Sequence, residues 1–171
     1  MKLIILLLAI IGIFASSNAP KAKDIPLVEN FELDKYLGTW YEIARLDHSF
    51  ERNLDSVTAT YSVRDDGKIK VLNKGYNTKK GKWSTAEGKA WIPNEDQPAR
   101  LKVSFFWIFS AEYRIIALDD EYSYAMVTSS SKKYLWILSR SPKMPEEKLD
   151  MLLKKAKDWG FDLSEIYFVK H

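Results

Sequence analysis

Few side chains in this sequence are suited to covalent or metal chemistry. The 171 residues include no cysteine and only two histidines, His48 and the terminal His171. Nucleophilic catalysis pairs a Ser, Thr or Cys with a positioned base, and neither histidine stands in a motif that supplies such a partner. His48 also lacks companion ligands at metal-binding spacing, so we interpret it as a hydrogen-bonding loop residue. The sequence therefore predicts no metal site, no cofactor and no nucleophilic enzyme, while a carboxylate pair acting as acid and base stays open.

Aromatic side chains are more prominent than reactive ones. Phe, Trp and Tyr make up 13% of the chain, whereas the formal net charge is only +3 and the charged residues are interspersed. Nucleic-acid binding needs a concentrated basic face, which this distribution lacks, so we expect no nucleic-acid partner. The function must instead make use of the rings.

The N-terminus has the three-part layout of a secretory signal. Lys2 precedes an apolar run from Leu3 to Phe14, and small residues follow from Ala15 to Ala19. We expect a cleaved signal peptide over 1–19, a flexible tether over 20–30 and a single domain over 31–171. Lipid attachment would need a cysteine after the apolar run. The expected product is exported and soluble, either periplasmic or secreted.

The elements that position the remaining candidates are short strands. Between Gly38 and Arg140 the chain shows two-residue alternation and β-branched or aromatic enrichment, interrupted by turn signals such as Asp65-Asp66-Gly67 and Lys79-Lys80-Gly81. Eight even strands indicate an antiparallel meander that closes into a barrel or folds into a sandwich. The predicted strands cover 39–46, 57–63, 68–75, 82–92, 100–106, 112–118, 123–129 and 133–140.

After Arg140 the pattern changes to a helix. Pro145 suits a first helical turn and Gly160 suits its end. One apolar stripe recurs at helical spacing, and we expect it to pack against the strands, with membrane binding as the alternative. The stripe consists of Leu149, Leu152, Leu153, Ala156 and Trp159. A last strand is predicted over 165–169.

Gly38, Trp40 and Arg140 form a structural group. Gly38 and Trp40 stand at the start of the first strand, and Arg140 ends the eighth. These strands are neighbours in a closed eight-stranded meander, so Arg140 is expected to lie over the Trp40 indole and seal one end. The predicted contribution of this cation–π pair is on the order of 1 kcal/mol.

Several of these segments resemble a known family. Gly38-Thr39-Trp40 is similar to the Gly-x-Trp signature of the lipocalins, Leu118-Asp119-Asp120-Glu121-Tyr122 resembles their second motif, and Ser139-Arg140 resembles the third. Longer stretches resemble the bacterial lipocalin branch (Blc, the outer-membrane lipocalins), which is related to apolipoprotein D. These stretches are Trp40 to Arg45, Phe50 to Arg52, Val57 to Tyr61, Leu101 to Phe106 and Tyr134 to Pro142.

The resemblance implies an all-β fold, an eight-stranded antiparallel up-and-down β-barrel with a C-terminal α-helix packed outside and a short final strand. It also implies a non-enzymatic protein that binds, stores or transports fatty acids or lysophospholipids in cell-envelope lipid maintenance. Strand parity predicts which side chains point into the cavity and line the ligand site. They are Glu42, Ala44, Ala59, Tyr61, Ile69, Val71, Asn73, Trp91, Val103, Phe105, Trp136 and Leu138.

One segment departs from the bacterial relatives, which commonly follow the Phe-Phe pair with Gly-Pro. Trp107 and Ile108 stand there instead and continue the apolar run to Phe109. An exposed patch at the barrel mouth would contact a membrane transiently, a ligand tail or a second subunit, and a tip folded onto its own barrel is the alternative. The protein is accordingly expected to be a monomer or a homodimer.

Two other functions remain open at this point. One is a lipid-modifying enzyme on the same scaffold, and the other is a barrel with a packed interior that serves as an interaction module. An unfilled interior would favour carriage, and Ala44 and Ala59 are small where a solid core calls for larger residues.

Overall fold

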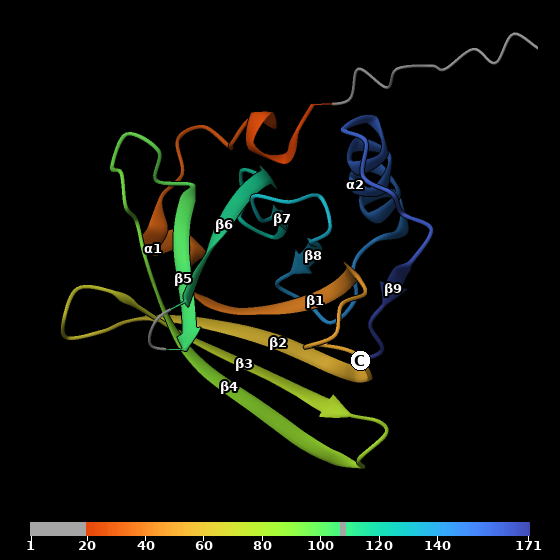
Figure 1. Cartoon of the computed structure of the whole chain (residues 1–171). Coiled ribbons are helices and arrows are strands. Elements are labelled where there is room, and N and C mark those ends of the chain that lie inside the picture. The colour runs from red at the N-terminus through yellow and green to blue at the C-terminus, as the bar shows by residue number, and fades with distance from the viewer. Residues whose placement is uncertain (1–19, 107–108) are drawn as a thin grey trace, which may run out of the picture.

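The strands close into a barrel, as predicted. A computed structural model describes residues 20–106 and 109–171. Eight strands pair with their neighbours in antiparallel order, and β1 pairs with both β2 and β8, which closes the sheet (Figure 1). The strands are β1 (Gly38–Leu46), β2 (Leu54–Val63), β3 (Ile69–Asn77), β4 (Lys82–Trp91), β5 (Arg100–Phe106), β6 (Phe109–Leu118), β7 (Tyr124–Thr128) and β8 (Leu135–Ser139).

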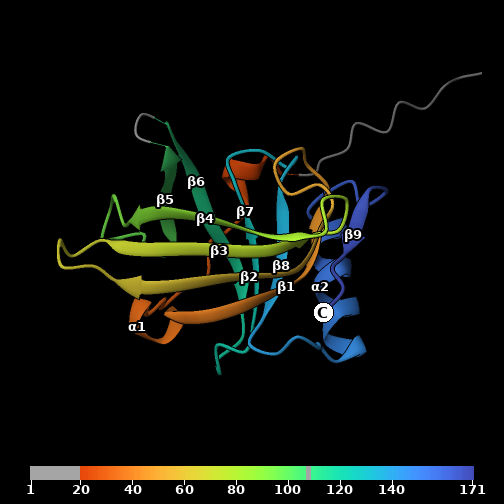
Figure 2. The same cartoon turned by 90° about the horizontal axis from the view of Figure 1, so that it is seen from below.

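A ninth strand and a helix complete the wall on the outside. β9 (Ile166–Phe168) pairs with Ala44–Leu46 of β1, beyond the stretch of β1 that pairs with β2. Helix α2 (Glu146–Asp158) lies outside the barrel, as Figures 1 and 2 show. Pro145 precedes the helix, and Gly160 after it has a φ of 77°. These are the start and stop that the sequence indicates.

Strand alternation sorts the apolar residues into two clusters. The inner cluster includes Trp40, Tyr61, Val71, Leu101 and Leu138. The outer cluster joins the wall of β1, β6, β7 and β8 to α2 and includes Ile43, Ile116, Met126, Ile137, Leu152 and Ala156. The predicted helical stripe therefore packs on the barrel. Within the described ranges, no helix has the length and hydrophobicity needed to cross a membrane.

A bulge in β1 reverses the parity of its second half. The register between β1 and β8 shifts between Glu42 and Ala44. Ile43 and Ala44 both join the outer cluster, while the Arg45 guanidinium returns to the side of the Glu42 carboxylate. The prediction that Ala44 points into the cavity is therefore wrong, because one extra residue in a bulge moves every later side chain to the other face.

The predicted inward orientation of Trp91 is also wrong. Ala90 is fully buried in the inner cluster and lies opposite Val103, so its neighbour Trp91 points to the opposite face, where it pairs with Lys102. The sequence prediction failed because residues 82–92 hold too few apolar residues on either face to reveal the parity of the strand.

Residues 20–30 pack against the barrel, which contradicts the flexible tether predicted there. A short helical turn, η1 (Ala22–Asp24), precedes Ile25, which is fully buried. The Arg114 guanidinium donates to the carbonyls of Lys23 (3.1 Å) and Ile25 (3.0 Å), and the Val28 amide donates to the Ile115 carbonyl (3.0 Å). Polar composition suggested disorder, but the buried side chains of Ala22 and Ile25 and these bonds to β6 hold the segment.

Candidate functional site

The barrel interior contains a cavity of about 180 Å³. Apolar and aromatic side chains from opposite walls form most of its surface, with a few polar groups among them. The predicted site residues that line it are Glu42, Ala59, Tyr61, Val71, Asn73, Val103, Phe105, Trp136 and Leu138. Parity thus brings together residues from β1, β2, β3, β5 and β8 that are distant in sequence.

The other predicted residues lie elsewhere. Ile69 is buried in the inner cluster, but it borders a second hollow beside Leu33 rather than the main cavity. Ala44 and Trp91 face outward, as described above. Trp107 and Ile108 lie outside the described residues, and only the backbone of Phe109 is described, where it pairs with Phe106.

Several residues that the sequence analysis did not select also line the cavity. Val57, Ala111 and Tyr113 come from strands, whereas Phe50 and Glu51 come from the loop between β1 and β2. Val57 shares its face with Ala59 and Tyr61, a signal that was present in β2. Ala111 and Tyr113 lie opposite Val103 and Leu101, so only the pairing register of β5 and β6 would have found them. The loop residues carry no periodicity.

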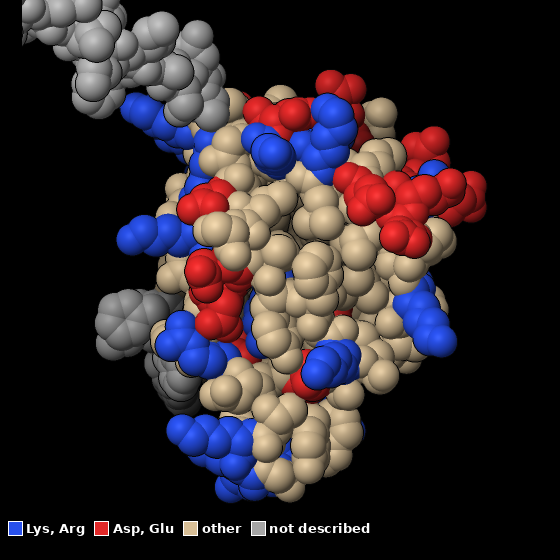
Figure 3. Space-filling view, turned by 90° about the vertical axis from the view of Figure 1, so that its right-hand side faces the viewer, with Lys and Arg blue, Asp and Glu red and all other residues tan. Residues whose placement is uncertain are grey.

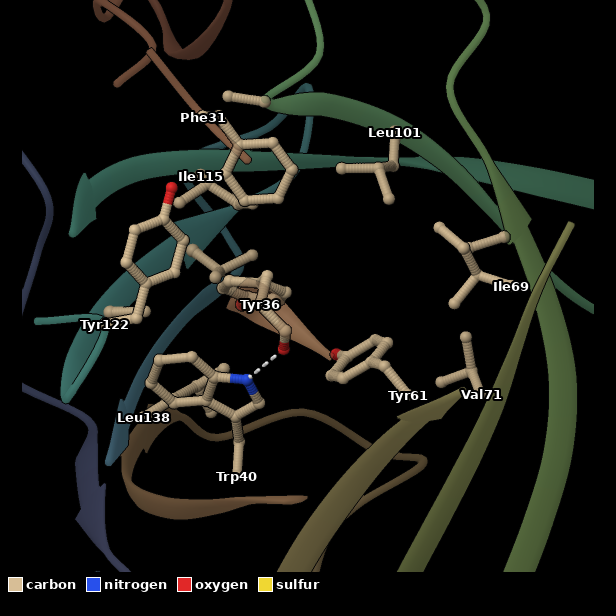
Figure 4. Packing of buried hydrophobic residues seen from close by; sticks show 14 residues of the cluster. Phe31, Tyr36, Trp40, Tyr61, Ile69, Val71, Leu101, Ile115, Tyr122 and Leu138 are labelled. Atoms are coloured by element: carbon tan, nitrogen blue, oxygen red, sulfur yellow. Dashed lines mark hydrogen bonds between the residues drawn. The ribbon is translucent and has the colours of Figure 1, made fainter. Parts of the chain in front are cut away.

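Aromatic rings close one end of the cavity, the end at which β1 begins. Helix α1 (Leu33–Tyr36) places Tyr36 at this end of the barrel, where the centre of its ring lies 4.8 Å from the centre of the Trp40 ring. The Trp40 indole N–H donates to the Tyr36 carbonyl at 2.8 Å, the dashed bond in Figure 4. Phe31 and Tyr122 extend this floor on the side away from Tyr61 (Figure 4). The packed rings exclude a ligand from this end.

Three tyrosine hydroxyls form a chain above the floor. The Tyr36 and Tyr113 hydroxyls lie 2.7 Å apart, and Tyr61 donates to Tyr113 at 2.9 Å. Burial raises the pKa of all three well above the usual value for tyrosine. The hydroxyls are therefore neutral, and they satisfy one another where the apolar cavity meets the floor.

Arg140 seals the floor from outside, as predicted. Its guanidinium carbon lies 4.0 Å from the centre of the Trp40 ring. Gly38 has a φ of 95°, and a Cβ there would lie 3.2 Å from Arg140 Nη1. The left-handed backbone therefore favours glycine, and a Cβ would in addition press on the packed guanidinium.

A buried polar cluster lies toward the opposite end. The Arg45 guanidinium is fully buried and donates to Glu42 Oε1 (2.8 Å) and to the carbonyls of Glu51 (2.8 Å) and Leu54 (3.1 Å). The Trp136 indole donates to Glu51 Oε2 at 2.9 Å. His48 Nε2 lies 3.0 Å from the same oxygen, and its ring stacks on Phe50. Glu42 and Glu51 also line the cavity, so this end of its mostly apolar surface is polar.

The two carboxyl groups and one guanidinium leave this cluster with one cation for two acids. Burial, and then repulsion from Glu51, raise the pKa of Glu42 to about 8, although Arg45 opposes both effects. Around neutral pH the protonated form of Glu42 is therefore favoured. Such a carboxyl group can donate a hydrogen bond as well as accept one.

This arrangement suits binding better than covalent chemistry. The cavity offers an apolar chamber, an acid held in its neutral form and an indole N–H that is already satisfied. In residues 20–106 and 109–171, no three His, Cys, Asp or Glu side chains gather in a way that could hold a metal ion. The geometry can shelter an apolar chain from water and place a few hydrogen-bonding groups near its polar end.

Comparisons with known proteins agree with the fold. A family model described as a lipocalin-like domain matches residues 31–171. The chain is 49% identical over 158 residues to the outer membrane lipoprotein Blc of Citrobacter freundii, covering 92% of this chain and 89% of the relative. It is 37% identical to apolipoprotein D of Macaca fascicularis over 163 residues, covering 88% and 85% of the two chains.

A solved structure supports the same assignment. Insecticyanin from the tobacco hornworm Manduca sexta superimposes with a TM-score of 0.69 and 25% identity, over 86% of this chain and 85% of that one. Its likeness extends over the barrel that the sequence resemblance predicts. The matched family model and the extent of identity together place this chain in the lipocalin family.

Proposed function

We propose that the protein carries a fatty acid or a lysophospholipid in the barrel cavity. The observation that supports this most strongly is the mostly apolar lining of the chamber, with a buried cluster of charged groups at one end. An acyl chain would pack against side chains such as Val71, Val103 and Leu138, and the ligand's polar group would lie toward Glu42 and Glu51. Eight-stranded barrels are wide enough to hold one such ligand.

The proposed setting is the cell envelope. The relatives at about half identity carry the name outer membrane lipoprotein, which is consistent with a role in envelope lipid maintenance. The apolar N-terminal run supports export by a cleaved signal peptide. We propose carriage or storage rather than catalysis, because among the described residues that line the cavity no hydroxyl is hydrogen-bonded to a histidine or a carboxylate.

Titration with oleate and with a lysophospholipid tests the proposal directly. Trp136 lines the cavity, so its fluorescence should change until about one ligand is bound per barrel, and Trp136→Phe should remove most of the response. Native mass spectrometry of the same samples should show one added ligand of unchanged mass. No response and no bound mass would refute carriage, and a cleaved ligand would favour an enzyme.

A further inference from the structure

The loops at the two ends of the barrel differ in charge. At the closed end, where α1 and Arg140 lie, the β2–β3, β4–β5 and β6–β7 connections carry the exposed acids Asp65, Asp66, Glu95, Asp96, Asp120 and Glu121. Only the first of these connections balances its acids, with Arg64 and Lys68. At the open end, the β3–β4 and β7–β8 connections carry Lys79, Lys80, Lys132 and Lys133, and Lys82 begins β4.

The cavity reaches toward the basic end. Phe50 and Glu51 of the β1–β2 connection line it, and this connection turns at the same end as the β3–β4 hairpin. The acids of the β1–β2 connection are already engaged, since Asp47 pairs with Arg52 at 2.9 Å and Glu51 is buried. The exposed acids Asp162 and Glu165 also lie at this end, where the Asp47 amide donates to the Glu165 carbonyl, so its positive charge is concentrated on the β3–β4 hairpin.

The β3–β4 hairpin concentrates this charge beside exposed aromatic rings. Trp83 is 53% exposed, and the Lys74 ammonium lies 4.4 Å from the centre of its ring. The adjacent β1–β2 loop presents Phe50, 65% exposed, and the Thr78 amide joins the two loops through a 2.9 Å bond to the Asn53 carbonyl. Figure 3 shows a group of Lys and Arg side chains at the lower left of the face, at the height of the hairpin in Figure 1, while other Lys and Arg side chains are scattered among the acidic ones above.

We propose that the β3–β4 hairpin docks the open end of the barrel onto a bilayer that contains anionic phospholipids. Clustered lysines are attracted to anionic head groups, and amphipathic rings such as that of Trp83 favour the head-group region. The acidic closed end is repelled by the same surface, so the asymmetry turns the cavity entrance toward the membrane. This contact does not depend on which ligand the cavity holds.

Vesicle sedimentation tests the docking. The full chain should bind vesicles of phosphatidylcholine with 30% phosphatidylglycerol, and binding should weaken sharply with added salt. The triple variant Lys79→Glu, Lys80→Glu, Lys82→Glu should bind these vesicles about tenfold more weakly or worse. Trp83→Ser, made alone, should also weaken binding to these vesicles.

A matched variant separates the effect of the hairpin from the effect of net charge. Lys143→Glu, Lys154→Glu, Lys157→Glu makes the same change of charge around α2 at exposed positions and should retain binding. Equal loss in both triple variants, equal binding to pure phosphatidylcholine, or no binding to either vesicle would overturn the proposal. All variants share one N-terminal segment, so that segment cannot explain a difference between them. Oleate titration of the hairpin variant should be unchanged, which keeps this test independent of the cavity.

Discussion

The Arg140 guanidinium stacks on the Trp40 indole with 4.0 Å between its central carbon and the ring centre, and this contact joins the end of β8 to the start of β1. The same guanidinium donates to three backbone carbonyls, those of Lys35 (2.7 Å), Thr39 (3.0 Å) and Tyr122 (3.2 Å). One side chain thus connects α1, β1 and the β6–β7 loop. It holds together the segments that form the floor of the cavity.

Arg140→Ala should therefore lower stability, while the residues that line the cavity stay the same. The cation–π contact and the hydrogen bonds to carbonyls together predict a loss of about 2 to 3 kcal/mol in the free energy of unfolding. Urea denaturation followed by far-UV circular dichroism measures this loss. Arg140→Lys should recover only part of it, because an ammonium cannot reproduce the planar fork that reaches three carbonyls. Unchanged stability in Arg140→Ala would contradict the structural role.

Much of the barrel follows from sequence because period two and turn residues are local signals. The alternation in Val57, Ala59 and Tyr61 identifies the inner face of β2, and Lys79-Lys80-Gly81 marks the end of β3. The bulge at Ile43 and Ala44 is different, because it is set by pairing with β8, where the partner of Ala44 is Ile137. Periodicity alone cannot reveal such a shift.

The polar end of the cavity was predictable only in part. Parity placed Glu42 inside and implied that a buried carboxylate needs a partner or a proton. Its partners, however, are Arg45, which returns to the inner side only because of the bulge, and Glu51, which a loop supplies. Neither position follows from local pattern, since one depends on strand register and the other on how the loop folds over the barrel.

Filling the cavity should abolish ligand binding while the barrel remains folded. Ala59 lines the chamber, so Ala59→Trp is expected to occupy the space of the ligand. Ser62→Trp on the same strand is the matched control, because Ser62 is exposed and lies next to inward-facing Tyr61. Displacement of a fluorescent fatty acid should be lost in the first variant and retained in the second. Retained binding in Ala59→Trp would place the site elsewhere.

Glu42 should make stability depend on pH. Its pKa is about 8 in the folded chain against 4.5 for the ordinary carboxyl, so between these values only the folded state retains the proton. The free energy of unfolding contributed by this group is therefore largest below pH 4.5 and falls as pH rises toward 8. Glu42→Gln removes the titration but retains an oxygen that can accept from Arg45.

Urea denaturation at pH 5, 6, 7 and 8 measures this effect. The stability of the natural chain relative to Glu42→Gln should decline steadily across the series. Glu87→Gln is the control, since Glu87 is an exposed partner of Lys70 and its removal should change stability little at any pH. A difference between the natural chain and Glu42→Gln that stays constant, or grows with pH, would show that the raised pKa is not what governs this site.

Gly88 gives Phe105 the space to face the cavity. A Cβ at Gly88 would lie 2.7 Å from Phe105 Cδ1 and 2.7 Å from the Ser104 carbonyl oxygen. The ring can rotate away, but the carbonyl belongs to β5 and moves only if the pairing of β4 and β5 opens. Gly88→Ala should therefore cost about 1 to 3 kcal/mol of stability. By pushing Phe105 inward, it should also weaken fatty-acid binding.

Gly75→Ala provides the comparison for this prediction. Its Cβ would meet only the side chains of Val57 and Leu54, at 3.2 Å or more, and these can adjust. Thermal unfolding and fatty-acid displacement should therefore both change less in Gly75→Ala than in Gly88→Ala. If the two variants behave alike, the constraint at Gly88 does not come from the β5 backbone. A ligand affinity unaffected in Gly88→Ala would mean that Phe105 does not limit the space available to the acyl chain.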